Sequence, residues 1–138
     1  MHQIIVGFAD AETAHRVTRE AAALASKLGA TLHVVTAIDE EARSVLEVGS
    51  DHWQFNSVDA AESSIREFMQ TLPDRGDYIA RAIEGKPADV LVEEANRIGA
   101  DLIVVGNVRM QGAGRLLGSV GSGVAHHAPC SVLIVKST

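Results

Sequence analysis

Residues Val104–Val135 read VVGNVRMQGAGRLLGSVGSGVAHHAPCSVLIV, and this stretch is the most informative part of the chain. A short apolar strand ends at Gly106, a glycine-dense loop follows, and a helix is expected to begin at Gly118-Ser119. Pro129 then separates that helix from a last apolar run. Many α/β proteins bind phosphate where a strand leads through such a loop into a helix, because the helix N-terminus attracts an anion. A nucleotide is therefore the first ligand hypothesis.

The rest of the chain alternates between strand and helix patterns. Apolar residues recur every three or four positions between Ala14 and Leu28, which predicts an amphipathic helix that Gly29 ends. A similar stripe runs from Val58 to Leu72, and a third helix opens at Lys86-Pro87. A fourth, short helix is expected over 120–127, and residues 38–54 read as a long surface loop. The expected strands are 3–7, 31–37, 78–83, 102–105 and 131–135.

This order of elements predicts one domain over residues 1–138 with a parallel sheet covered by helices on both faces. With right-handed crossovers, the expected product is a doubly wound five-stranded α/β sheet in the order 3-2-1-4-5. Ligands of such folds bind where the chain reverses direction, outside the carboxyl ends of the strands. The two loops at that point are Gly7–Asp10 and the loop that starts at Gly106. Topology and glycine content thus indicate the same site.

Composition limits the classes of partner. The net charge is −6 and the pI about 5.4, which argues against binding of nucleic acid or anionic lipid through overall positive charge. The N-terminus MHQIIVGF lacks the pattern of a signal peptide, and no apolar run approaches the roughly 20 residues that span a bilayer. Cys130 is the only cysteine, so no internal disulfide is expected. We expect a cytoplasmic protein with no dedicated metal site.

Two common phosphate motifs are excluded. A Walker A loop needs Lys and then Ser or Thr directly after its last glycine, which is absent, and Leu117 stands where a dinucleotide fingerprint needs its third glycine. Ser119 is expected to be the N-cap of the following helix, whose dipole favours an anion by roughly 0.3–1 kcal/mol. The alternative is that Ser119 only caps the helix and the glycines only permit a tight loop.

The order of elements and this stretch resemble the universal stress protein family (UspA type), which carries G-x2-G-x9-G-[ST] after its fourth strand and binds ATP or a related adenine nucleotide in its nucleotide-binding branch. Gly106, Gly118 and Ser119 match that motif, and HAPC at 127–130 matches the phrase that follows it. IIVG at 4–7, ETA at 12–14 and LHVV at 32–35 match the family's other segments. The resemblance implies the adenine nucleotide alpha hydrolase-like version of the fold and a ligand such as ATP, AMP or cyclic AMP, with Mg²⁺ accompanying a triphosphate.

The departures from the family pattern fall on the ligand site. Arg109 stands in place of the second motif glycine, and eight residues rather than nine separate it from Gly118. Ala9 replaces an acidic residue that contacts the nucleotide in the family, although Asp10 is next to it. In one interpretation Arg109 blocks the close backbone approach that glycine allows. In the other its guanidinium donates to phosphate oxygens.

The sequence therefore predicts a stress-response protein that acts by binding an adenine nucleotide rather than by catalysis. Adenine is expected near Phe8, Ala9 and Val34, and the phosphates on backbone groups around Gly106 and Gly118. The predicted nucleotide-binding residues are Gly7, Phe8, Ala9, Asp10, Val34, Gly106, Asn107, Val108, Arg109, Gly118, Ser119 and Val120. The alternative is a family member without nucleotide that acts as a dimeric interaction module, and a third hypothesis is a hydrolase, of which slow ATP cleavage would be the sign.

The last strand predicts a partner. Val132, Leu133, Ile134 and Val135 form a continuous apolar run on an edge strand, and an unprotected edge invites pairing with another chain. Family members commonly dimerise through this strand, so the resemblance implies a homodimer with these four residues at its centre.

Overall fold

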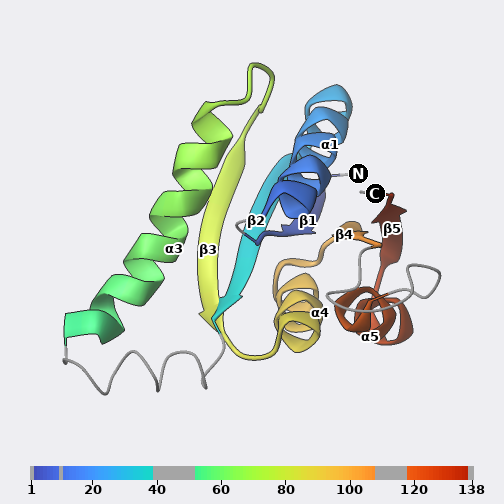
Figure 1. Ribbon diagram of the computed structural model, residues 1–138. Coiled ribbons are helices and arrows are strands. Elements are labelled where there is room, and N and C mark those ends of the chain that lie inside the picture. The colour runs from blue at the N-terminus through green and yellow to red at the C-terminus, as the bar shows by residue number, and fades with distance from the viewer. Residues whose placement is uncertain (1, 10, 39–51, 108–117, 137–138) are drawn as a thin grey trace.

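The computed structural model describes residues 2–9, 11–38, 52–107 and 118–136, with the backbone alone described for 52–57. A central five-stranded sheet is packed between helices, with β3 at one edge and β5 at the other (Figure 1). The elements are β1 Gln3–Gly7, α1 Glu12–Leu28, β2 Thr31–Ile38, α3 His52–Gln70, β3 Tyr78–Glu84, α4 Pro87–Ile98, β4 Leu102–Gly106, α5 Ser119–His127 and β5 Ser131–Val135.

The strand order β3-β2-β1-β4-β5 confirms the predicted topology, and every pairing is parallel. The chain runs outward from β1 to β3 and then returns to the other side of β1 with β4. The reversal therefore lies between β1 and β4, whose carboxyl ends are Gly7 and Gly106. This is the point that the sequence predicted for a ligand.

Alternate side chains of the strands build two cores. On the face covered by α1 and α3, Ile4, Leu32 and Val104 are buried with Ile65 of α3. On the face covered by α4 and α5, the strand residues Ile5, Val35 and Ile103 are buried against apolar side chains of those two helices. The strands read as nearly continuous apolar runs because both faces of the sheet are covered.

Several predicted boundaries are wrong. Residues 38–54 are not one loop, since Ile38 ends β2 and α3 begins at His52, while 39–51 lie outside the described residues. The first turns of α3 were not predicted, because they lack the helical spacing of apolar residues. Trp53 and Phe55 are two residues apart rather than three or four. Leu28 is 47% exposed and thus leaves the buried stripe of α1.

The cap of α5 also differs from the prediction. Gly118 is the N-cap, Ser119 is the first helical residue, and no side chain caps this end. Serine and glycine are both acceptable N-caps, so sequence alone did not separate these adjacent positions. Gly29 ends α1 in the left-handed conformation, as predicted, and Gly99 ends α4 in the same conformation.

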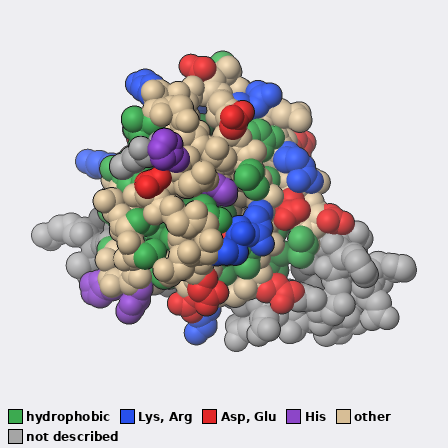
Figure 2. Space-filling view, turned by 180° about the vertical axis from the view of Figure 1, so that it is seen from behind, with side chains coloured by type: hydrophobic (Ala, Val, Ile, Leu, Met, Phe, Trp, Pro, Cys, Tyr) green, Lys and Arg blue, Asp and Glu red, His purple; other side chains and the backbone are tan. Residues whose placement is uncertain are grey.

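Among the described helices, none is long and apolar enough to cross a membrane. Figure 2 shows the face opposite to the view of Figure 1. On its coloured part, basic and acidic side chains lie interspersed with small groups of hydrophobic ones.

Candidate functional site

A cavity of about 690 Å³ opens at the carboxyl edge of the sheet. Its volume falls in the range of roughly 300–1,000 Å³ that is typical of small-molecule sites. The described lining comes from the ends of β1, β2 and β4 and from the N-terminal parts of α1, α4 and α5. These residues are Gly7, Phe8, Ala9, Ala11, Thr13, Ala14, Val17, Val35, Thr36, Ala37, Pro87, Leu91, Val105, Gly106, Gly118, Ser119, Val120 and Gly121.

The fold brings most of the predicted site residues together. Those that line the cavity are Gly7, Phe8, Ala9, Gly106, Gly118, Ser119 and Val120. The two glycine-containing loops thus meet at one place, although they are about a hundred residues apart in the chain. The predicted residues Asp10, Val108 and Arg109 lie outside the described residues.

Two other predicted residues are placed differently. Val34 is fully buried in the core on the α1 and α3 side of the sheet and does not line the cavity. The next residues, Val35, Thr36 and Ala37, line it instead. Asn107 follows the cavity-lining Gly106, but its backbone N–H donates a hydrogen bond to the carbonyl oxygen of Val135, 3.1 Å away.

Sequence analysis missed the wall that α4 provides. Pro87 and Leu91 both line the cavity. A Cβ atom added to Gly7 would lie 3.1 Å from Cδ1 of Leu91, so α4 lies about as close to β1 as a glycine allows. The one sequence signal was the expected helix start at Pro87, because it places a helix N-terminus at the carboxyl edge of the sheet.

Three helix N-termini face this cavity. Ala11, Lys86 and Gly118 are the N-caps of α1, α4 and α5, and none of these ends has a side-chain cap hydrogen bond. Residues at or next to each cap, such as Ala11, Pro87 and Ser119, line the cavity. Uncapped N–H groups and helix dipoles favour negative charge, so this end of the molecule suits an anionic ligand.

Polar side chains in the described lining are few. They are the hydroxyl groups of Thr13, Thr36 and Ser119, and the other described lining side chains are apolar or glycine. A largely apolar cavity with a few hydroxyls and exposed backbone N–H groups can enclose an aromatic base and hold a phosphate at one end.

An aromatic stack supports the Phe8 wall. The ring of His15 on α1 stacks on Phe8 at 5.7 Å and on Phe68 of α3 at 4.4 Å between centroids. The guanidinium of Arg19 lies 5.9 Å from the centroid of the Phe68 ring. Phe8 is only 7% exposed, so this stack fixes a cavity wall against both helices of its face.

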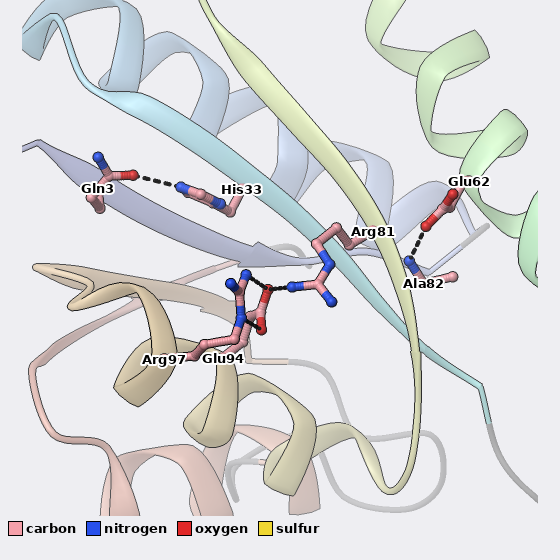
Figure 3. A network of polar contacts seen from close by, with 7 residues as sticks. All are labelled: Gln3, His33, Glu62, Arg81, Ala82, Glu94 and Arg97. Carbon is pink, nitrogen blue, oxygen red and sulfur yellow. Dashed lines mark hydrogen bonds and ion pairs between the residues drawn. The ribbon is translucent and has the colours of Figure 1, made fainter.

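A buried carboxylate anchors the far end of α4 (Figure 3). Glu94 is 4% exposed, and Nη1 of Arg81 on β3 donates to its Oε2 at 2.7 Å. Arg97 donates to both carboxylate oxygens, at 2.7 and 2.8 Å. The hydrogen bond from Arg97 and the charges of both arginines lower the pKa of Glu94, against the opposing effect of burial. Glu94 is thus ionised and ties α4 to β3.

His33 on β2 is a second buried polar group on this face. It is 6% exposed, its Nε2 contacts Oε1 of Gln3, and its Nδ1 is buried without a partner in the described structure. Burial lowers the pKa of His33, and the charges of Arg97 and Arg81 lower it further, while Glu94 opposes them. His33 is therefore neutral near pH 7, with Nε2–H donating to Gln3.

Comparison with known proteins places these features in a family. The family model for the universal stress protein family matches residues 1–136. A universal stress protein of Mycobacterium tuberculosis is 52% identical over 59 residues, which are 42% of this chain and only 40% of that protein's length. A Staphylococcus aureus protein named as a universal stress protein is 28% identical over 138 residues, or 97% of this chain and 83% of that one.

A solved structure adds a ligand-bound relative. A universal stress protein in complex with cAMP superposes with a TM-score of 0.76 at 30% identity, over 99% of this chain and 98% of that one. The family match over residues 1–136 and this superposition agree. The chain belongs to the universal stress protein family.

Proposed function

We propose that this protein binds an adenine nucleotide in the cavity at the carboxyl edge of the sheet and acts in stress response or signalling by binding. The observation that carries the proposal is the convergence of three uncapped helix N-termini on one largely apolar cavity. The cAMP complex of a relative at 30% identity supports the choice of an adenine nucleotide.

The described lining contains hydroxyl and backbone groups, which can hold a phosphate. The relative at 30% identity is a complex with cAMP, a nucleotide with one phosphate. We therefore propose AMP or cAMP as the first ligands, with ATP as the comparison. The phosphate would lie at Gly118–Gly121, and the base near Phe8 and the end of β2.

The test is calorimetric titration of AMP, cAMP and ATP into the protein, with and without Mg²⁺. Saturable heat with at least one of them is the expected result. Ser119→Glu should abolish it, because a carboxylate at the start of α5 repels phosphate although it suits the helix dipole. Ala125→Glu is the charge-matched control, since Ala125 is exposed on the same helix and does not line the cavity.

Arg109→Gly separates the two sequence-based interpretations of Arg109. If the arginine blocks binding, the variant binds more tightly than the wild type; if it donates to phosphate, the variant binds more weakly. Silence of both proteins with all three nucleotides would reject the nucleotide function and leave the interaction module as the proposal.

We also propose a homodimer through β5. Leu133 and Ile134 are 40% and 38% exposed. Val132 packs partly buried against the core on the α4 and α5 side, and Val135 is 4% exposed in the core on the α1 and α3 side. In such a dimer the unpaired backbone edge of β5 and the side chains of Leu133 and Ile134 form the contact. Sedimentation as a monomer at micromolar concentration would count against it.

A further inference from the structure

The β4 wall of the cavity is hydrogen-bonded to the edge strand β5. Gly106, which lines the cavity, lies in register with Val135 at the end of β5. The N–H of the next residue, Asn107, donates to the carbonyl oxygen of Val135 at 3.1 Å. The β4 side of the cavity therefore shares backbone hydrogen bonds with β5.

Helix α5 makes a second connection. It begins with the cavity-lining residues Ser119, Val120 and Gly121, and β5 starts four residues after α5 ends at His127. Gly121 and Gly123 lie within this nine-residue helix, and glycine is the least favourable helix residue apart from proline. The order of α5 therefore depends on its contacts, such as the buried Val124 and the close approach of Gly123 to Ala88.

The outer edge of β5 suits a second copy of this chain. Ser131–Val135 carries no ionisable side chain, so two copies of a chain with net charge −6 meet there without like charges opposed. On the opposite edge of the sheet, the N–H of Ala82 on β3 donates a hydrogen bond to the carboxylate of Glu62, so one backbone donor of that edge is occupied. Leu133 and Ile134 supply exposed apolar contact on the two faces of β5.

We infer that nucleotide binding in the cavity and pairing of β5 with a second copy strengthen each other. The inference rests on the proposed nucleotide and dimer functions. A phosphate at the start of α5 and a partner strand along β5 order the same unit, residues 118–135. The conformational entropy lost in ordering that unit is lost once, so the second event costs less. Linkage requires the effect to be reciprocal.

Sedimentation of the full chain, with and without saturating cAMP, tests the inference. The dimer dissociation constant should fall by about fivefold or more with the nucleotide, the lower end of typical coupling between two sites. AMP serves as a second probe, so that the result does not depend on one phosphate geometry.

A pair of variants tests the reciprocal direction. Ile134→Lys places a charge in the β5 edge and should abolish the dimer. It should also weaken cAMP binding per site by about the square root of the factor by which cAMP tightens the wild-type dimer, because a dimer of this chain has two cavities. Ile79→Lys is the matched control, because Ile79 is 46% exposed on the opposite edge strand. It should leave both constants unchanged, and circular dichroism checks that each variant is folded.

The outcomes distinguish failure of the linkage from failure of nucleotide binding itself. cAMP binding with an unchanged dimer constant, or with a monomer at all concentrations, overturns the linkage and leaves nucleotide binding in place. Absence of binding by any nucleotide overturns both. Equal weakening of cAMP binding by Ile79→Lys and Ile134→Lys would also overturn the linkage, since the effect would not come from β5.

Discussion

The carboxylate of Glu62 on α3 accepts a hydrogen bond from the backbone N–H of Ala82 on β3, with 3.0 Å between the nitrogen and Oε2. Ala82 lies on an edge strand, and its N–H points away from β2 toward α3. A side chain therefore occupies a donor that would otherwise be open to another chain. Exposed apolar side chains lie on both edge strands, Ile79 on β3 and Leu133 and Ile134 on β5, so this hydrogen bond is what marks the β3 edge.

Removal of this cap should open the β3 edge. Glu62→Ala is expected to lower the free energy of unfolding by about 1 kcal/mol through the lost hydrogen bond. It should also increase self-association. Urea unfolding and sedimentation measure the two effects. Glu67→Ala, at an exposed position of the same helix, is the control, and equal behaviour of both variants would contradict the edge-capping role.

Glu94→Gln should weaken the attachment of α4 to β3. The amide retains the shape but loses the charge that both arginines contact, with an expected cost of about 1–3 kcal/mol in unfolding free energy. The arginines are partly exposed, which keeps the cost below that of a fully buried triad. Glu93→Gln is the neighbouring exposed control. A loss no larger than that of the control would show that the ion pairs contribute little.

His33 should make the protein less stable in mild acid. Its pKa is lowered by burial, so below its ordinary value of 6.5 the unfolded chain takes up a proton that the folded chain resists. This stabilisation is complete above 6.5 and is lost as the pH falls toward the lowered pKa. Glu94, whose pKa is lowered from 4.5, acts only at more acidic pH.

The measurement is urea unfolding at about pH 7.5 and about pH 5.5, with a maximum slope of about 1.4 kcal/mol per pH unit for one group. His33→Gln should reduce the difference between the two values. His126→Gln, at an exposed position, should not. An unchanged pH dependence in His33→Gln would assign the effect to other groups.

Gly123→Ala tests the contact between α5 and α4. The added Cβ would lie 2.8 Å from the Cβ of Ala88, so one helix must shift, with an expected loss of about 1–3 kcal/mol. Helix propensity alone predicts that the free energy of unfolding rises by about 1 kcal/mol. The sign of the change measured by urea unfolding therefore shows whether the contact or the propensity dominates. Ala88→Gly in the same chain should restore stability. A more stable Gly123→Ala variant would show that the contact relaxes freely.

The sequence predicted the sheet well because its signals are local and repeated. Apolar runs such as 3–7 and 102–105 alternate with helical stripes, and Gly29 and Gly99 mark helix ends by their freedom at positive φ. Right-handed crossovers then leave few strand orders. Local signals failed where an element has no apolar period, as in the first turns of α3.

The candidate site was only partly predictable. Glycines at 7, 106 and 118 identify the two loops, because both follow strand ends. The sequence predicts Val34, whereas Val35 and Thr36 line the cavity, because strand membership alone does not fix which residues reach the carboxyl edge. Leu91 was missed because its place over Gly7 depends on how closely α4 packs on β1.

The fold class, the strand order and the end of the sheet at which the cavity opens follow from the sequence, since periodicity and glycine positions are properties of the chain. Only the tertiary structure decided what surrounds that point. The starts of α1, α4 and α5 converge from distant parts of the chain. The hydrogen bonds from Ala82 to Glu62 and from Asn107 to Val135 also join residues that are far apart in sequence. Such contacts depend on packing between elements, which no local pattern of residues encodes.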